Sequence, residues 1–198
     1  MAGGVAFLEK MSKPRKTKSE PLTGFTILEL MVVIFVITIL TTIYLAGYRS
    51  GEKSFRLQRA ANKLASDIRR AAELSMSAKD SKDSCAGITA NAYGIYAVSL
   101  APTSYKLYAD TAGNDRLYSP SDCVIEDIKL EKGVIIQDIN TVPKKASISF
   151  QPPDPQTFIK WTNPDDETGS VTITLGLQND PTKIRKVTVN RSGLIDID

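Results

Sequence analysis

The 198-residue chain contains no histidine, so it lacks the commonest general base and the commonest metal ligand. Ser192 therefore has no histidine to activate it, and a Ser-His nucleophile is excluded. The GxxxxGK pattern of phosphate-binding loops is also absent. We therefore expect that the protein is not an enzyme and that it uses no cofactor and no metal ion.

Cysteine is scarce, with only Cys85 and Cys123. The two show no CxxC spacing and have no histidines with which to share a metal ion. In a domain exported across a membrane such a pair most often forms one disulfide, and two unrelated buried thiols are the alternative.

The net charge of +3 belongs to the first residues of the chain. Residues 1–24 hold five of the 25 basic and two of the 22 acidic side chains, which leaves 20 of each in the remainder. The body of the protein is therefore neutral overall, which gives no support for a nucleic-acid-binding domain.

A long apolar run follows this basic segment, and residues 30–48 carry no charge. As a helix this stretch is just long enough to cross a bilayer. The basic residues before it predict that residues 1–24 stay in the cytoplasm and that everything after Gly51 lies outside. A secretory signal peptide would need a shorter apolar core with a cleavage site after it, so a plain signal anchor is the closer rival.

The helical pattern continues beyond the apolar run, and we expect one helix from about Phe25 to about Ala78. Small and apolar residues recur every three or four positions on one face: Leu57, Ala61, Leu64, Ile68, Ala72 and Ser75. Basic residues on the other faces are expected to be solvated, because no aromatic residues interleave with them as in a DNA-binding stripe.

After residue 80 the sequence predicts a β-rich domain. Short runs of β-branched and aromatic residues alternate with turns rich in Gly, Pro, Asn and Asp. We expect strands at Tyr93–Leu100, Tyr105–Ala109, Val124–Leu130, Val134–Asp138, Ala146–Phe150, Thr157–Trp161, Ser170–Leu177, Ile184–Val189 and Leu194–Ile197. The short turns favour antiparallel pairing, in one sheet or two, and Gly193 is expected to supply a positive φ in the last hairpin. The predicted fold class is α+β.

Two acidic clusters in predicted turns have oxygen ligands of the kind that calcium prefers. One holds Asp110, Asn114 and Asp115, and the other holds Asp165, Asp166 and Glu167. Neither has EF-hand spacing, so solvated turn residues are the favoured interpretation of both.

The stretch "GFTILEL" from Gly24 to Leu30 resembles the processing site of type IV prepilins. In that family a basic leader ends in glycine, a phenylalanine or methionine follows, and a glutamate lies fifth in the processed chain. Gly24, Phe25 and Glu29 match these positions. A carboxylate inside an apolar run is costly in an ordinary membrane anchor, which makes the match specific. The family often has a proline about twenty residues into the helix, whereas this chain has Gly47 and Gly51.

The resemblance implies cleavage by a prepilin peptidase between Gly24 and Phe25 and methylation of the Phe25 amine. It also implies that Glu29 meets that amine on a neighbouring subunit. The predicted parts are a cytoplasmic leader (1–24), a transmembrane or filament-core helix (25–48), an amphipathic continuation (49–79) and a globular head (80–198). The runs "YGIYAVSL", "GSVTITL" and "IRKVTVNRSGLIDI" resemble the all-β heads of GspH/FimT-type pseudopilins.

The resemblance implies a structural subunit, a minor pilin or pseudopilin, of a type IV pilus or type II secretion pseudopilus. Its expected location is the bacterial inner membrane with the head outside, and then a periplasmic or cell-surface filament. The expected partners are the peptidase, other pilin or pseudopilin subunits, and inner-membrane lipid before assembly. One alternative is a membrane-anchored extracytoplasmic domain with a binding role. Another is a DNA-uptake pilin using Lys183, Arg185, Lys186 and Arg191, which the acidic end "DID" disfavours, so nucleic acid is an unlikely partner.

Overall fold

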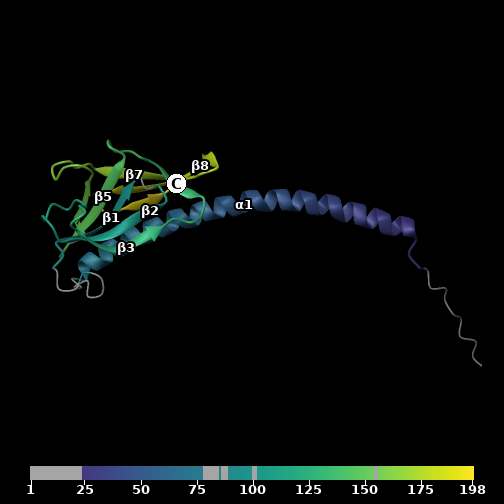
Figure 1. Cartoon of the computed structure of the whole chain (residues 1–198), viewed down its shortest axis with the longest axis horizontal. Helices are drawn as coiled ribbons and strands as arrows, with labels where there is room; N and C mark the ends of the chain where they lie inside the picture. Colours follow the sequence, from purple (N-terminus) through teal and green to yellow (C-terminus); the bar gives the residue numbers. More distant parts are fainter. Residues whose placement is uncertain (1–23, 78–84, 86–88, 100–101, 154–155) are drawn as a thin grey trace, which may run out of the picture. The chain divides into compact units, whose positions relative to one another are not determined.

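The computed structural model describes residues 24–77, 85, 89–99, 102–153 and 156–198, without the side chains of residues 46–50. One helix, α1 (Ile27–Met76), is followed by nine strands (Figure 1). The chain divides into two compact units, one ending at Leu45 and one running from Ala46 to Asp198. The predicted α+β class is confirmed at this level: an apolar N-terminal helix and a domain of antiparallel sheets.

The head contains two antiparallel sheets. The first, with strand order β3-β2-β1-β5-β6, comprises β1 (Ala92–Val98), β2 (Ser104–Asp110), β3 (Cys123–Lys129), β5 (Lys145–Gln151) and β6 (Gln156–Lys160). The second, with order β4-β7-β8-β9, comprises β4 (Val134–Ile139), β7 (Ser170–Leu177), β8 (Asp180–Asn190) and β9 (Ile195–Ile197). All nine expected strands are present, with ends that differ by a few residues. The widest difference is in β8, which begins four residues before the expected Ile184.

One hydrophobic core joins both sheets to the second half of α1. In the first sheet, Ile95 of β1 pairs with Leu107 on one side and Ile148 on the other. In the second sheet, Ile173 of β7 lies between Ile139 and Val187. All of these side chains are buried, and because paired residues of neighbouring strands lie on one face, each set lies on the core side of its sheet.

The helix contributes a wide, small-residue face to this core. Its buried apolar side chains are Leu57, Ala60, Ala61, Leu64, Ala65, Ile68 and Ala71. Four of the seven are alanines, which let strands approach the helix backbone closely. Figure 1 shows this half of α1 running beside the strands of the head. The face is broader than the predicted stripe, because strands from two sheets pack against it.

Candidate functional site

The first helical segment in the described part of the chain is apolar and unburied. Ile27–Leu45 has a mean hydropathy of 2.5 over 19 residues, and none of it is covered by the rest of the protein. At about 1.5 Å per residue it spans roughly 28 Å, close to the thickness of a hydrocarbon core. By length and composition this segment can cross a membrane, which a signal sequence near an N-terminus can do as well.

The threonine hydroxyls of this segment are satisfied within the helix. The hydroxyls of Thr38, Thr41 and Thr42 donate to the backbone carbonyls of Ile34, Ile37 and Thr38, at 2.7–2.8 Å. Such back-bonding lets a threonine sit in an apolar medium without an unpaired donor. These three hydroxyls therefore do not oppose burial of the segment in lipid or among other helices.

Thr26 caps the start of α1. Its side-chain oxygen accepts a hydrogen bond from the backbone N–H of Glu29 at 3.1 Å, and its carbonyl accepts from Leu30 N–H at 3.1 Å. Thr26 and Glu29 thus have the T-x-x-E spacing of a capping box. Thr26 was not among the predicted functional residues, although this spacing is visible in the sequence.

The predicted processing and assembly residues lie together at this end of the chain. Gly24 and Phe25 precede the helix, and 82% of the Phe25 side chain is exposed. Glu29 lies in the first turn, where the helix dipole favours a negative charge. It is the only charged residue between Ile27 and Leu45, it is exposed, and no ion pair involving it occurs within the described part of the chain. The helix dipole therefore gives the Glu29 charge a local role that does not depend on any partner.

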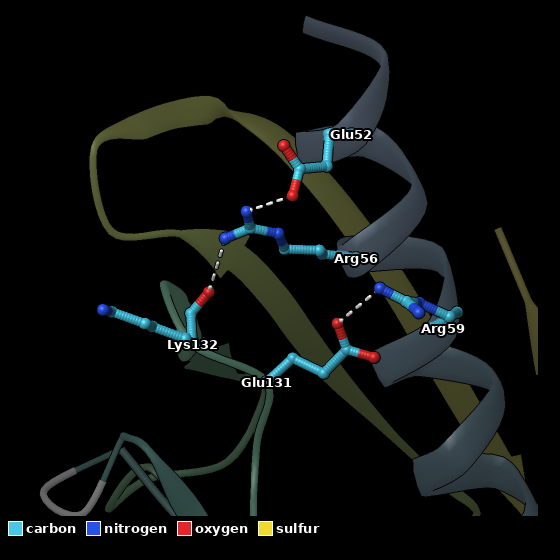
Figure 2. Close-up of polar contacts among 5 residues, drawn as sticks. All are labelled: Glu52, Arg56, Arg59, Glu131 and Lys132. Carbon is cyan, nitrogen blue, oxygen red and sulfur yellow. Dashed lines mark hydrogen bonds and ion pairs between the residues drawn. The ribbon is translucent and has the colours of Figure 1, made fainter. Parts of the chain in front are cut away.

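Farther along α1, one ion pair and one hydrogen bond join the helix to the turn between β3 and β4 (Figure 2). Arg56 bonds Glu52 one turn earlier, and its other nitrogen donates to the carbonyl of Lys132 at 3.4 Å. Arg59 reaches Glu131 at 3.2 Å. The hydrogen bond and charge of Arg56 lower the pKa of the Glu52 carboxyl below its usual value. Arg59 is exposed, as expected for a solvated face, and Arg56 is partly covered, so these surface contacts add little to the attachment of the turn.

A buried hydrogen bond joins α1 to the first sheet about two turns beyond Arg59. The Tyr105 hydroxyl of β2 donates to Asp67 of α1 at 2.6 Å, and Lys63 approaches the same carboxylate oxygen at 3.4 Å. Burial, followed by the bond to Asp67, raises the pKa of Tyr105. A hydrogen bond to a charged group contributes about 1.5–3 kcal/mol, so this contact fixes the helix against the first sheet.

The two cysteines form a disulfide, with their Cα atoms 6.0 Å apart. This confirms the predicted pairing of Cys85 with Cys123 and excludes two separate buried thiols. Cys123 opens β3, directly after the long segment 111–122 that follows β2. The disulfide therefore anchors the end of that segment.

Segment 111–122 covers the outer face of the first sheet. The ring of Tyr118 stacks on that of Tyr96, with centroids 4.4 Å apart. The backbone N–H of Tyr118 donates to the Ser147 hydroxyl of β5 at 3.0 Å, and the Ser149 hydroxyl donates to the Arg116 carbonyl at 2.9 Å. Both serines are fully buried, so the outer face of this sheet is a second, polar interior rather than a solvated surface.

The first candidate calcium cluster lies in this segment, and its carboxylates hold the backbone. Asp110 accepts from Arg116 N–H at 2.9 Å, and Asp115 accepts from Leu117 N–H at 2.9 Å. In the other cluster, Asp166 accepts from Asn163 N–H at 2.9 Å. No group of three acidic, cysteine or histidine side chains arranged to hold a metal ion occurs among the described residues. The favoured interpretation, solvated turn residues, agrees with the exposed Asp165, but it is wrong for Asp110, which is the last residue of β2 and is fully buried because segment 111–122 covers it.

Comparison with known proteins identifies no relative: no family model, no curated protein and no solved structure matches this chain.

Proposed function

We propose that this protein is a filament subunit of the minor pilin or pseudopilin kind, cleaved between Gly24 and Phe25 and assembled through its N-terminal helix. The observation that carries the proposal is the unburied apolar segment Ile27–Leu45 with one carboxylate, Glu29, in its first turn. A self-contained head accompanies this segment, and its core closes without it.

The energetics of the segment support assembly. Fully burying a large apolar side chain contributes about 1.5–3 kcal/mol, so the exposed residues of Ile27–Leu45 favour transfer into lipid or a bundle of like helices. The Glu29 charge distinguishes these two surroundings. In lipid it lacks a counter-charge, whereas in a bundle it can meet the Phe25 amine of a neighbouring subunit.

The partners in this proposal are a prepilin peptidase, other pilin or pseudopilin subunits, and inner-membrane lipid before assembly. The chain would begin as a single-pass protein of the bacterial inner membrane with its head outside. After cleavage it would join a type IV pilus or a type II secretion pseudopilus.

DNA binding by the head has less support. Of the four basic residues near the C-terminus, Arg191 pairs with Glu167 at 2.7 Å and Arg185 donates to Gln58 at 2.7 Å. These contacts occupy part of the charge that a phosphate backbone would need. A membrane-anchored binding domain remains the rival that a cleavage assay separates from the proposal.

Intact-mass spectrometry of the native protein tests the processing step. A chain that starts at Phe25, heavier than calculated by about 14 Da for one methyl group, is the expected product. Gly24→Val should leave the leader attached and serves as the control. A native chain that still begins at Met1 would make the protein a plain membrane anchor and would refute the proposal.

Two variants separate the charge of Glu29 from its capping role. Glu29→Gln keeps a residue suited to a capping box but removes the charge, and we expect it to enter membranes normally. Breaking a buried charge pair costs about 3–5 kcal/mol, so its incorporation into filaments should fall by roughly two to four orders of magnitude. The measurement is the fraction of the protein in sheared filaments against that in the membrane.

Thr26→Ala is the matched control, because it removes the cap at a cost of about 1 kcal/mol and leaves the charge in place. Near-normal incorporation of this variant, beside the loss in Glu29→Gln, would support charge pairing. Equal losses in both variants would assign Glu29 to helix capping alone and contradict the pairing.

A further inference from the structure

One end of the head carries mostly basic side chains. There Arg56 of α1 donates to the Lys132 carbonyl, and the Gln178 N–H of the β7–β8 hairpin donates to the Gly133 carbonyl at 2.9 Å. We define this region as residues 52–59, 130–133 and 178–185 and call it the basic end. Its charged side chains are Lys53, Arg56, Arg59, Lys132, Lys183 and Arg185 against Glu52, Glu131 and Asp180.

The basic end is the positive pole of the chain beyond residue 24. Its six basic and three acidic side chains give it a net charge of +3. All residues after Gly24 together hold 20 basic and 20 acidic side chains, so the remainder has a net charge of −3. A charge distribution of this kind attracts an anionic surface to the positive pole, and the attraction does not require unpaired side chains.

Two of the three carboxylates are held in ion pairs along α1. Glu52 pairs with Arg56, and Glu131 pairs with Arg59 at 3.2 Å. All four side chains are at least partly exposed, so water and salt screen the pairs and each contributes little. The two arginines can therefore turn from these carboxylates to a phosphate group at little cost.

Lys53 and Lys132 add charge that no ion pair holds. Both are exposed, and neither ammonium group forms an ion pair or a hydrogen bond within the described residues. Figure 2 shows the Lys132 side chain extending away from α1. The third carboxylate, Asp180, accepts a hydrogen bond from the Thr182 hydroxyl. That bond, and after it the charges of Lys183 and Lys53, lower the pKa of Asp180.

A small hollow lies among these side chains. It has a volume of about 80 Å³, and three cations, Lys53, Arg56 and Lys132, line it together with one carboxylate, Asp180. This volume is well below the roughly 300–1,000 Å³ of pockets that bury drug-sized ligands. The hollow therefore suits a phosphate group held at the surface and not a buried organic molecule.

The basic end follows the apolar segment closely in the chain. Lys53 comes eight residues after Leu45 in the same helix, which is about 12 Å at 1.5 Å per residue. If Ile27–Leu45 fills the hydrocarbon core, the headgroup layer occupies roughly the first 6 Å of that distance. Lys53 is then within one Debye length, about 8 Å, of the headgroups. Tyr44, at the end of the segment, is a residue type that favours the headgroup level.

We propose that the basic end binds the anionic phospholipid headgroups of the membrane that Ile27–Leu45 crosses, and so holds the head at the membrane surface before assembly. Lys53, Arg56 and Lys132 contact headgroup phosphates through charge-assisted hydrogen bonds. The other basic side chains contribute through their field, because each Lys or Arg near an anionic membrane surface adds to the attraction.

The position of the basic end selects lipid as the partner over nucleic acid. Phosphate is the shared chemistry, but the chain connection keeps these side chains beside the bilayer, where headgroups are the phosphates at hand. The proposal rests on the part of the proposed function in which Ile27–Leu45 crosses a membrane, and it does not depend on cleavage or on Glu29. A failure of cleavage or of filament assembly would leave the lipid contact unchanged, so the two proposals fail separately.

The test places the full chain in lipid nanodiscs with a trace of gadolinium-chelating lipid, which broadens the NMR signals of amides near the headgroups. One set of discs is phosphatidylcholine, and the other is equal parts of phosphatidylcholine and phosphatidylglycerol. Gly133 and Asn140 lie at the two ends of β4. The paramagnetic relaxation rate of the Gly133 amide should be about threefold higher in the anionic discs, with a smaller change at Asn140.

Salt and insertion complete this measurement. One molar salt shortens the Debye length to about 3 Å and should remove the difference between the discs. Equal relaxation rates of the Gly133 amide in the two kinds of disc would overturn the proposal. A chain that does not enter the discs at all would overturn it as well, because the basic end would then have no bilayer beside it.

Two double variants make the result specific. Lys53→Gln with Lys132→Gln should remove the difference between the discs. Arg69→Gln with Lys144→Gln removes the same charge from exposed residues outside the basic end and should keep the difference. Equal losses in both would assign the effect to net charge alone and refute the site. Duplex DNA that shifts the Gly133 signal in neutral discs, in the native chain and not in the first variant, would make nucleic acid the partner and also refute the proposal.

Discussion

Asp110 offers a test of the polar interior beneath segment 111–122. Its side chain is fully buried, and one carboxylate oxygen accepts from Arg116 N–H at 2.9 Å. The other oxygen has no hydrogen-bond partner among the described residues. Burial, reinforced by the charges of Asp122 and Asp115, raises the pKa of Asp110 from 3.8 to about 6.

The direction of the effect on stability follows from that pKa. Below pH 3.8 the carboxyl is protonated in both the folded and the unfolded chain, so its full stabilisation is present. As pH rises to about 6 and beyond, the unfolded chain releases its proton first, and the folded state loses stability. The difference between the two pKa values corresponds to a loss of about 3 kcal/mol in the free energy of unfolding by pH 8.

Asp110→Asn removes the charge and keeps an oxygen to accept from Arg116 N–H. We therefore compare the free energy of unfolding of the variant with that of the native protein. This difference should be up to about 3 kcal/mol more favourable to the variant at pH 8 than at pH 4. For a chain of this size that corresponds to roughly 6–12 °C in melting temperature. The assay is urea and thermal unfolding of the head within the full chain, in detergent micelles, at both pH values.

Asp165→Asn is the control, because Asp165 is exposed and its substitution should leave the pH dependence unchanged. The reasoning would be refuted by an Asp110→Asn variant whose stability relative to the native protein is the same at pH 4 and pH 8. If the Asp110→Asn variant were more destabilised relative to the native protein at pH 8 than at pH 4, the ionised carboxylate would stabilise the fold. That result has the opposite sign to the expected effect of burial on this carboxyl.

Two further predictions concern the head. Reducing the Cys85–Cys123 bridge, which spans a sequence separation of 38, should cost roughly 3–4 kcal/mol by loop entropy and lower the melting temperature by about 10 °C; identical melts with and without reductant would contradict this. Gly94→Ala should destabilise the head by about 1–3 kcal/mol in urea titrations, because a Cβ there would lie 2.6 Å from the Ile148 carbonyl oxygen. Gly51→Ala, where nothing lies within 4 Å, is its control and should be neutral or slightly stabilising.

Local patterns were enough to locate the elements. The strands were predictable because each is a short apolar run bounded by turn residues, and Gly193 has the expected positive φ of 78°. The helix ends at Met76, two residues before the expected Ala78. Both signals depend on neighbouring residues only, which is why a single sequence contains them.

The assembly of those elements was not predictable from the same patterns. β1 pairs with β5, across the whole of β2, β3 and β4, while β4 belongs to the other sheet. These choices depend on contacts between residues far apart in sequence. The breadth of the helix face has the same origin: Ala60, Ala65 and Ala71 are buried because two sheets reach α1, and no periodicity of the helix alone indicates that.

The same distinction between local patterns and long-range contacts applies to the candidate site. Gly24, Phe25 and Glu29 were assigned from the resemblance of their spacing to a processing site, and their roles stay predictions. The capping spacing of Thr26 is visible in the sequence as well. The role of segment 111–122 was not visible in the sequence, because its aspartates look alike as calcium ligands and as turn residues. Only the long-range contacts of Tyr118 and Arg116 with β1 and β5 decide between those interpretations.

The two units of the chain differ in how far their apolar and charged groups are satisfied without a partner. The head has a buried apolar core that includes one face of α1. Glu131 and Glu126 form ion pairs with arginines of α1, and a disulfide anchors the end of segment 111–122. None of the segment Ile27–Leu45 is buried within the protein, so its side chains contact the surrounding medium. Lipid and a helix bundle both satisfy the apolar groups, and the threonines are already satisfied. Glu29 is therefore the one group of that segment whose free energy differs strongly between the two surroundings, so a substitution there separates insertion from assembly, whereas an apolar substitution weakens both.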